Sequence, residues 1–335
     1  MSFVLADVYN TDTFNQRVMM DYITTKPYNP QMFSKWLPWN SQGELSHLAM
    51  IEFREGSLSL IPEAERGAPG YRPDDYVRSE IPVKIPHFPM QKTLLAESVR
   101  GTRAFGSELM EVFEDERNTI LQSFTDYFSV NWENSRAGAI TGKLYKANGV
   151  DISKNWFDIF DVQQTTHEID FDDANADMIE EITDAKEKAE DELGDLVADG
   201  FLLVAGRNFQ KKFKGHVSFK KAFDRFDFGS VFRQDGRAGV VITNDVNMVT
   251  YTRGKVNGFY FIDPNEAYLC PLADGMYQTR FAPGLGMSTL GAKGLPENIA
   301  TKLLDFDEGI EFKGDTNVIS YVQRPKAIVK LTAKQ

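Results

Sequence analysis

The sequence predicts an α+β protein made of several structurally distinct segments. A proline-free amphipathic stretch at 107–136 indicates one long helix. Two alternating strands flank a polar, Gly/Pro-rich stretch within 47–88, which is typical of an extended β-hairpin. Helical and strand patterns then alternate over 175–280, and strands close the chain, as in a compact mixed domain. With 335 residues, the chain is long enough for about two domains.

Residues 1–44 are predicted to form an N-terminal arm. Apolar residues at helical spacing predict a short helix over 12–23. The next stretch, KPYNPQMFSKWLPWN, holds three prolines and two tryptophans, a composition typical of an irregular, extended segment. Its large side chains either contact a partner subunit or pack on their own domain. The candidates are Phe33, Trp36 and Trp39.

Residues 45–88 are predicted to form an extended loop built on the hairpin. Val77, Ile81, Val83 and Ile85 fall on one face of the second strand, with charged residues on the other. An isolated two-stranded ribbon is marginally stable in water, so we expect the hairpin to lie on another surface, often that of another subunit. The polar stretch between the strands adds further contact candidates, whose charged members either pair across subunits or are solvated: Glu65, Arg66, Tyr71, Arg72 and Asp74.

The long helix has one apolar stripe, and its polar residues lie opposite. At about 1.5 Å per residue the helix would reach about 45 Å, more than the core of a small domain needs. An Asn-Gly pair at 148–149 predicts a hairpin turn after it. The predicted stripe comprises Leu109, Phe113, Ile120, Phe124, Tyr127 and Phe128.

The second half of the chain has the pattern of a compact domain. A helix is predicted over 173–198, with Asp173 or Asn175 as its N-cap, and FLLVAG reads as a buried strand. In the basic segment 207–225, the phenylalanines either form a core face or interleave with lysines in a nucleic-acid groove; their i, i+4 spacing favours the core face. Two strands, at 318–322 and 327–331, end the sequence.

One glycine-rich stretch, FAPGLGMSTLGAKG at 281–294, comes close to the phosphate-binding pattern GxxxxGK[ST]. Gly286 and Gly291 keep the glycine spacing, but Ala292 stands where the lysine would be. The following Leu295-Pro296 disfavours an immediate helix. We therefore interpret the stretch as a flexible connector between β elements.

Other candidate chemistry is weak as well. The acidic run HEIDFDDANAD at 167–177 either ligates a hard cation or caps the helix that follows, and the absence of EF-hand spacing favours capping. The four histidines form no metal-binding motif, and Cys270 lies among apolar residues, as a buried, inert thiol does. No catalytic, cofactor-binding or metal-ligating residue is predicted.

The charge and hydropathy narrow the possible partners. A formal net charge of −12 disfavours simple electrostatic adhesion to DNA or to an anionic membrane. The sequence holds no stretch of about 18 apolar residues, and its first residues lack the layout of a signal peptide, so we expect synthesis in a reducing cytoplasm.

The order of these segments resembles the major capsid proteins of tailed phages, in particular the family of the lambda-type capsid protein E. The resemblance covers most of residues 45–333 and depends on the order of several stretches more than on any one of them. These are RGAPGYRPDDYVRSEIPVKIP, AITGKLYKANG, LLVAGRNFQKKFKGHVSFKKAF, FIDPNEAYLCPLADGMYQTRFAP and VISYVQRPKAIVKLTA.

The resemblance implies the tailed-phage major-capsid fold, with an N-terminal arm, an extended loop (E-loop), a peripheral domain with a long spine helix, and an axial domain. The expected segments are the arm at 1–44, the E-loop at 45–88, the peripheral domain at 89–172 with return strands at 300–335, and the axial domain at 173–299. The glycine-rich stretch would then be an axial-domain connector that adapts to both hexamers and pentamers.

The resemblance also implies a function without catalysis. The chain would be a major head protein that self-assembles into hexamers and pentamers of an icosahedral phage head enclosing double-stranded DNA. Expected partners are copies of itself, scaffold, portal and decoration proteins, and packaged DNA bound without sequence specificity. It would belong to the virion and assemble in the host cytoplasm.

Two alternatives remain open at this point. One is an encapsulin-like shell of a cellular compartment, which shares the fold and would enclose enzyme cargo. The other is a nucleotide-using enzyme with a degenerate phosphate-binding loop, which would bind ATP.

Overall fold

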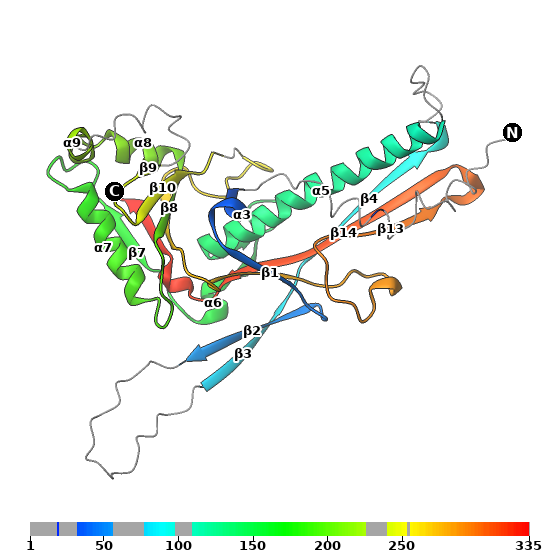
Figure 1. Ribbon diagram of the computed structural model, residues 1–335, viewed down its shortest axis with the longest axis horizontal. Helices are drawn as coiled ribbons and strands as arrows, with labels where there is room; N and C mark the ends of the chain where they lie inside the picture. Colours follow the sequence, from blue (N-terminus) through cyan, green and yellow to red (C-terminus); the bar gives the residue numbers. More distant parts are fainter. Residues whose placement is uncertain are drawn as a thin grey trace, which may run out of the picture.

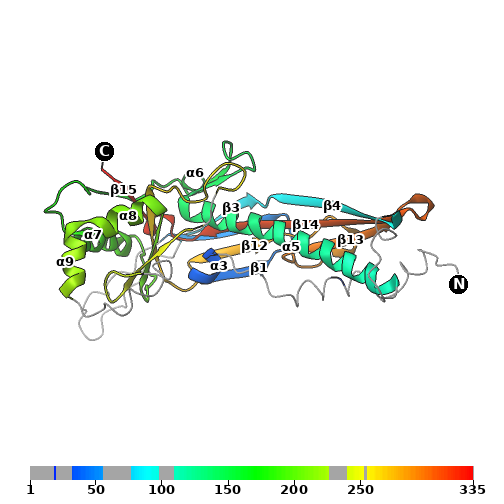
Figure 2. The same cartoon turned by 90° about the horizontal axis from the view of Figure 1, so that it is seen from above.

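The computed structural model describes residues 19, 32–55, 77–97, 109–225, 240–252 and 255–334. These residues form three parts: a long layer of one helix on a sheet, a compact mixed domain at one end of it, and a projecting β-hairpin (Figure 1). Figure 2 shows that the layer is extended, with the compact domain at the end that holds the C-terminus.

The elongated layer consists of a five-stranded sheet and the helix α5. Strand β14 is its axis, with β12 and β13 pairing along one side and β4 along the other, and β1 adds to β12 in parallel. The elements are α5 (Leu109–Thr141), β1 (Trp39–Gly43), β4 (His87–Leu95), β12 (Tyr277–Phe281), β13 (Asn298–Leu303) and β14 (Gly309–Val322).

Alternation along β14 explains how the layer is packed. Phe312 and Val318 face α5 and join the core formed with that helix. Gly314 lies on the same face, where an added Cβ would come within 2.7 Å of the Phe124 ring. Ile319 and Tyr321 point to the opposite face and pack in a second core, beneath the projecting hairpin. One strand thus holds the helix on one face and the hairpin base on the other.

The projecting hairpin consists of β2 (Leu48–Glu55) and β3 (Val77–Lys84), paired antiparallel as predicted. Its base is anchored because Ile51 and Val83 are buried against Trp156, in the helix α6 (Trp156–Phe160). The rest of it extends away from the layer (Figure 1).

The long helix is confirmed, with two differences. It continues through Gly138 to Thr141. The helix packs closely on Leu144 at this point, and an added Cβ at Gly138 would lie 2.8 Å from the Leu144 Cα, which explains the glycine there. Tyr127 was predicted in the apolar stripe but is 61% exposed, whereas Trp132 is buried in the helix–sheet core. The predicted Asn-Gly hairpin follows, between β5 (Lys143–Tyr145) and β6 (Ile152–Asn155).

The compact domain is a six-stranded mixed sheet with helices packed on it. Strand β8 is buried along its whole length, and Phe209, Phe213 and Phe219 of the basic segment face the same core, as predicted. The strand order is β7 (Thr166–Ile169), β15 (Val329–Ala333), β11 (Glu266–Pro271), β8 (Phe201–Ala205), β10 (Val246–Thr250) and β9 (Val240–Val241). The helices are α7 (Met178–Asp191), α8 (Arg207–Gly215) and α9 (Val217–Arg225).

Strand pairing joins strands that the predicted segments separate, including β7, which was predicted in the segment 89–172 but pairs with β15 in the compact sheet. β15 was placed with the return strands at 300–335, but it pairs with β11 and β7 in the compact sheet. Conversely, β12 and β13 lie in the elongated sheet, although the predicted axial segment reaches residue 299. The physical reason is that both sheets are built from strands distant in sequence, and alternation does not reveal which strands pair.

The described part of the arm is more regular than predicted. It forms a short helix, α3 (Met32–Trp36), and then β1, which pairs in parallel with β12. The helix predicted over 12–23 lies outside the described residues, apart from Met19, which is helical and buried.

Candidate assembly surfaces

The arm aromatics pack on their own chain, one of the two alternatives that the sequence left open. Phe33 is fully buried and stacks on Tyr251 with ring centroids 5.3 Å apart, and Trp36 meets Tyr251 edge-on. The Trp39 indole N–H donates to the Phe33 carbonyl oxygen at 2.9 Å, and the Arg136 guanidinium lies over the Trp39 ring. Phe33 therefore offers no surface to a neighbour, whereas Trp36 and Trp39 are half-buried and remain contact candidates.

The predicted contact residues between β2 and β3 lie outside the described residues: Glu65, Arg66, Tyr71, Arg72 and Asp74. Close to the hairpin base, two apolar side chains are exposed, Leu45 and Met50.

An open sheet edge runs along the elongated layer. β4 pairs with β14 over residues 87–95, and within the described residues its other edge has no partner strand. Unpaired edges of this length readily accept another strand, and natural proteins usually cover or interrupt them. The outer edge of β4 is therefore a candidate surface for contact with another chain.

The glycine-rich stretch connects β12 to β13, so it leaves a strand and enters a strand, as predicted. This excludes the strand-to-helix turn of a phosphate-binding loop. We call residues 284–296 the glycine loop. It contains the short 3₁₀ helix η3 (Met287–Thr289) and belongs to the elongated sheet instead of the compact domain.

Hydrogen bonds hold the backbone of the glycine loop in place. The Thr289 hydroxyl lies 2.6 Å from the Gly284 carbonyl oxygen and 2.7 Å from the Gly286 carbonyl oxygen, so its single O–H is shared between these two acceptors. At the loop's end the Gly294 N–H donates to the Glu44 carbonyl oxygen at 2.8 Å. A Cβ at position 294 would lie 2.1 Å from the Phe281 carbonyl oxygen, so this close approach requires glycine. The loop nonetheless presents Leu285, Met287 and Leu290 to solvent, with Met287 86% exposed.

The hairpin turn between β13 and β14 exposes a further apolar side chain. Here the short 3₁₀ segment η4 (Asp305–Asp307) holds Phe306 94% exposed. Both Phe306 and Asp307 have positive φ, 61° and 56°, which is rare for a bulky residue. We call residues 304–309 the acidic tip, since it contains Asp305, Asp307 and Glu308. A lone phenylalanine in an acidic turn was the sole sequence signal for this feature.

A buried carboxyl group lies where the glycine loop joins β13. Glu297 is 5% exposed, and the Thr125 hydroxyl of α5 donates to its Oε2 at 3.1 Å. Burial raises the pKa of Glu297 to about 7, with the neighbouring Asp126 carboxylate adding to the rise and the Thr125 hydrogen bond opposing it. No sequence pattern indicates this group, because its burial depends on the packing of α5.

The acidic run has a structural role. Asp177 is the N-cap of α7, with its side chain accepting from the Ile179 N–H at 2.9 Å, one turn later than the predicted caps. His167 Nε2 lies 2.7 Å from Glu181, and Lys188 Nζ lies 2.9 Å from His167 Nδ1. Within the described residues no cluster of three or more His, Cys, Asp or Glu side chains is placed to hold a metal ion.

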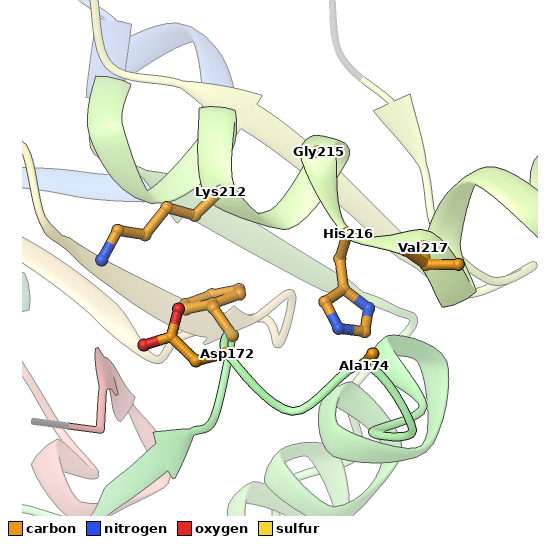
Figure 3. Close-up of a pocket in the computed structure, with 7 residues that line it drawn as sticks. Asp172, Ala174, Lys212, Gly215, His216 and Val217 are labelled. Atoms are coloured by element: carbon orange, nitrogen blue, oxygen red, sulfur yellow. The ribbon is translucent and has the colours of Figure 1, made fainter.

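Figure 3 shows a pocket of the compact domain, between the loop before α7 and the junction of α8 and α9. Its one titratable ring, His216, is already engaged: Nε2 lies 2.9 Å from the Asp173 carbonyl oxygen and Nδ1 lies 3.0 Å from the Ser218 hydroxyl. The lining residues are Phe171, Asp172, Ala174, Lys212, Gly215, His216 and Val217. These contacts fasten α8 and α9 to the start of α7, and they account for the histidine as a structural residue.

Two remaining features of the chain are its single cysteine and the apolarity of its helices. Cys270 is fully buried, and burial raises the pKa of its thiol, in agreement with the inert thiol expected. Among the helices that the structure describes, none combines the length and apolarity needed to cross a membrane.

The fold matches that of proteins that build phage shells. Over 96% of this chain and 99% of the other, the structure is similar to a putative capsid protein of a prophage of E. coli CFT073, with a TM-score of 0.60 and 12% identity. It is also similar to a chain of the satellite phage P4 procapsid, with a TM-score of 0.51 and 9% identity over 100% of this chain and 92% of the other.

The amino-acid sequence is also similar to that of phage capsid proteins. The chain is 22% identical to the major capsid protein of Pseudomonas phage KPP10 over 296 residues, which are 82% of this chain and 84% of that protein. The family model described as phage major capsid protein E matches residues 15–333. The chain therefore belongs to the phage major capsid protein E family. It is a structural protein of the virion that assembles with copies of itself into a shell.

Proposed function

We propose that the chain forms hexamers and pentamers of an icosahedral head that encloses double-stranded DNA. The carrying observation is that one chain combines a projecting hairpin with an elongated layer that exposes apolar residues and, within the described residues, leaves the outer edge of β4 unpaired. A monomeric protein gains nothing from these features, whereas a shell subunit needs repeated contacts on several sides.

The projecting hairpin supports this proposal most directly. Its base is fixed in its own chain by Ile51 and Val83, and it then leaves the layer. A two-stranded ribbon gains stability when it lies on another surface. We assign that surface to a neighbouring subunit, with Trp36, Trp39 and the five residues predicted between β2 and β3 as contact candidates.

The charge distribution fits a container for DNA. A net charge of −12 disfavours tight binding of the packaged polyanion, which would otherwise hinder both packaging and release. The phenylalanines of the basic segment, Phe209, Phe213 and Phe219, are buried in the compact domain, so they are not available to stack on bases. We therefore propose DNA packaging without sequence-specific recognition.

The family membership supports further partners. A head built from this chain would assemble in the host cytoplasm with scaffold, portal and decoration proteins. The glycine loop would adapt to the different surroundings of hexamers and pentamers through the side chains of its exposed residues, while its hydrogen-bonded backbone stays in place.

Negative-stain electron microscopy of the purified full chain, beside size-exclusion chromatography, tests the proposal. We expect shells, rings or sheets. A variant in which residues 56–76 are replaced by a short glycine-serine turn should fold, by circular dichroism, yet lose the higher assemblies. Tyr127→Ala, an exposed position on α5, is the matched control and should assemble normally. A wild-type chain that stays monomeric at every concentration would contradict the proposal, and enzyme cargo in purified native particles would favour a cellular compartment instead.

A further inference from the structure

We infer that the acidic tip of one subunit docks on the glycine loop of a neighbouring copy of the chain, with Phe306 as the anchor. The inference depends on the proposed shell function and assigns one of its contacts. Two observations carry it: the backbone geometry of the tip, and the complementary chemistry of the loop.

The tip exposes its aromatic ring in an unusual way. Phe306 is 94% exposed and has φ 61°, a conformation that side chains with a Cβ seldom adopt. Within the described residues the ring lies almost wholly in solvent, and the turn is closed by its own backbone, with the Glu308 N–H donating to the Asp305 carbonyl oxygen. Outliers of this kind cluster at binding and functional sites, where a partner compensates for them.

The glycine loop offers what such a ring would need. Leu285, Met287 and Leu290 are exposed on a backbone that the Thr289 hydroxyl and Gly294 hold in place. An apolar surface that is already formed loses little entropy when it binds. Met287 adds the favourable contact that a thioether makes with an aromatic ring.

The charges of the two surfaces are complementary. Lys293 is exposed and is the single charged residue of the glycine loop. The tip surrounds its phenylalanine with three carboxylates, from Asp305, Asp307 and Glu308. Docking therefore brings a lysine close to carboxylates around an apolar centre, the usual arrangement of a small interface with a polar rim.

The two surfaces belong to different places in one chain, so the contact must join two chains. In Figure 1 the β13–β14 turn lies at the end of the elongated layer away from the compact domain, and the connection from β12 to β13 lies apart from it, below the layer. A contact between two different patches is heterologous, and repeated contacts of this type close into rings when the rotation allows. This suits a symmetric shell.

Disulfide trapping tests the contact directly. Two differently tagged chains, one carrying Phe306→Cys and the other Leu290→Cys, would be co-assembled and treated with a mild oxidant. We expect a cross-linked dimer that contains both tags. Val150→Cys replaces Leu290→Cys in the control pair, because Val150 is 78% exposed but lies in the β5–β6 turn; that pair should give no cross-link. The native Cys270 is buried and should stay unmodified.

The outcomes separate this inference from the proposed function. The contact would be overturned if the wild-type chain forms shells but the Phe306→Cys and Leu290→Cys pair gives no mixed cross-link, or if only two Phe306→Cys chains become cross-linked. The shell function would still stand in either case. Failure of the wild-type chain to assemble at all would overturn both.

Charge reversal gives an independent measurement. Lys293→Glu should lower the yield of assembled particles several-fold, and adding Asp307→Lys to the same chain should restore most of it. Phe306→Ala should lower the yield without changing the circular dichroism of the chain, whereas Val197→Ala, at another exposed position, should have no effect. Unchanged assembly of both Phe306→Ala and Lys293→Glu would overturn the contact.

Discussion

The compact domain and the elongated layer use their apolar residues in opposite ways. In the compact domain the central strand β8 is buried throughout, and α7, α8 and α9 turn their apolar faces to the same core. In the described part of the chain, the elongated layer has the long helix α5 on its sheet, a β4 edge without a partner strand, and apolar side chains exposed on the glycine loop and the acidic tip. The compact domain buries its apolar residues within its own chain, whereas the layer leaves apolar residues exposed that a neighbouring chain can cover.

This difference in exposed apolar residues indicates which parts of the chain are candidates for assembly contacts. An exposed leucine means little by itself, because much of any protein surface is apolar. It becomes informative when its backbone is held in place and its neighbours are also apolar, as in the glycine loop. By this criterion we expect the contacts of the shell mainly on the elongated layer and the hairpin.

We expect the greatest loss of stability from a substitution in the internal core of the layer. Phe128→Ala removes a buried ring from between α5 and β14, so the free energy of unfolding should fall by about 3–5 kcal/mol. The adjacent Tyr127→Ala, at an exposed position, should change it by less than about 0.5 kcal/mol. Chemical denaturation of the unassembled chain measures both. Equal losses would mean that α5 presents a different face to the sheet.

A smaller effect depends on pH and is confined to the layer. Glu297 ionises near 4.5 in the unfolded chain and near 7 in the folded one, so between these values the folded chain holds a proton that the unfolded chain releases. Stability from this group should therefore fall as pH rises from about 4.5 to 7, by at most roughly 3 kcal/mol.

Glu297→Gln should remove this slope, since the amide does not ionise, while Glu187→Gln, at an exposed site of α7, should leave it unchanged. Unfolding curves recorded at intervals across this pH range measure the slope. An identical slope in the wild type and in Glu297→Gln would show that another group controls it.

A third prediction concerns the compact domain, where local capping contributes to stability. Asp177→Ala removes the side chain that accepts from the Ile179 N–H, and should cost about 1 kcal/mol. Asp184→Ala, at an exposed position within the same helix, serves as the control and should cost less. Thermal unfolding followed by circular dichroism compares them. A larger loss at Asp184 would mean that the acidic run does more than cap the helix.

The smallest effect is expected at the surface. Lys146 and Asp151 form an ion pair at 3.9 Å in the β5–β6 hairpin, with both side chains more than half exposed. Lys146→Ala should therefore change the unfolding free energy by less than about 0.5 kcal/mol, and the change should shrink further in high salt. A loss that persists at high salt would point to packing of the lysine stem.

Much of the fold could be predicted because local patterns specify it. The period of the phenylalanines indicated that α8 and α9 are core helices, and alternation located the hairpin strands and the last part of β14, at 318–322. What could not be predicted was pairing between distant strands. Nothing in the alternation of Val329 and Leu331 indicates that β15 joins the compact sheet, because register and partner depend on the whole chain.

The candidate surfaces show the same limit. Aromatic composition identified Phe33, Trp36 and Trp39 as important, but it could not distinguish a ring that binds a neighbour from one that stacks on Tyr251. The error at Tyr127 has a similar origin, since tyrosine is amphipathic and one helical position decides whether it faces the sheet or solvent. Phe306 was overlooked because its importance lies in its backbone angle and exposure, which a residue name does not convey.

Strand β14 takes part in each of the three cores that the described residues form: Val318 lies in the helix core, Ile319 in the hairpin core and Val322 in the compact core. A filled head would stretch its wall outward, and each subunit would carry tension along its length. Pulling a strand along its own axis loads its flanking hydrogen bonds in shear, so they share the force and resist together. Because β14 is flanked along its length by β4, β13 and β12, it is the strand that would transmit this tension between the compact end of the subunit and its far tip.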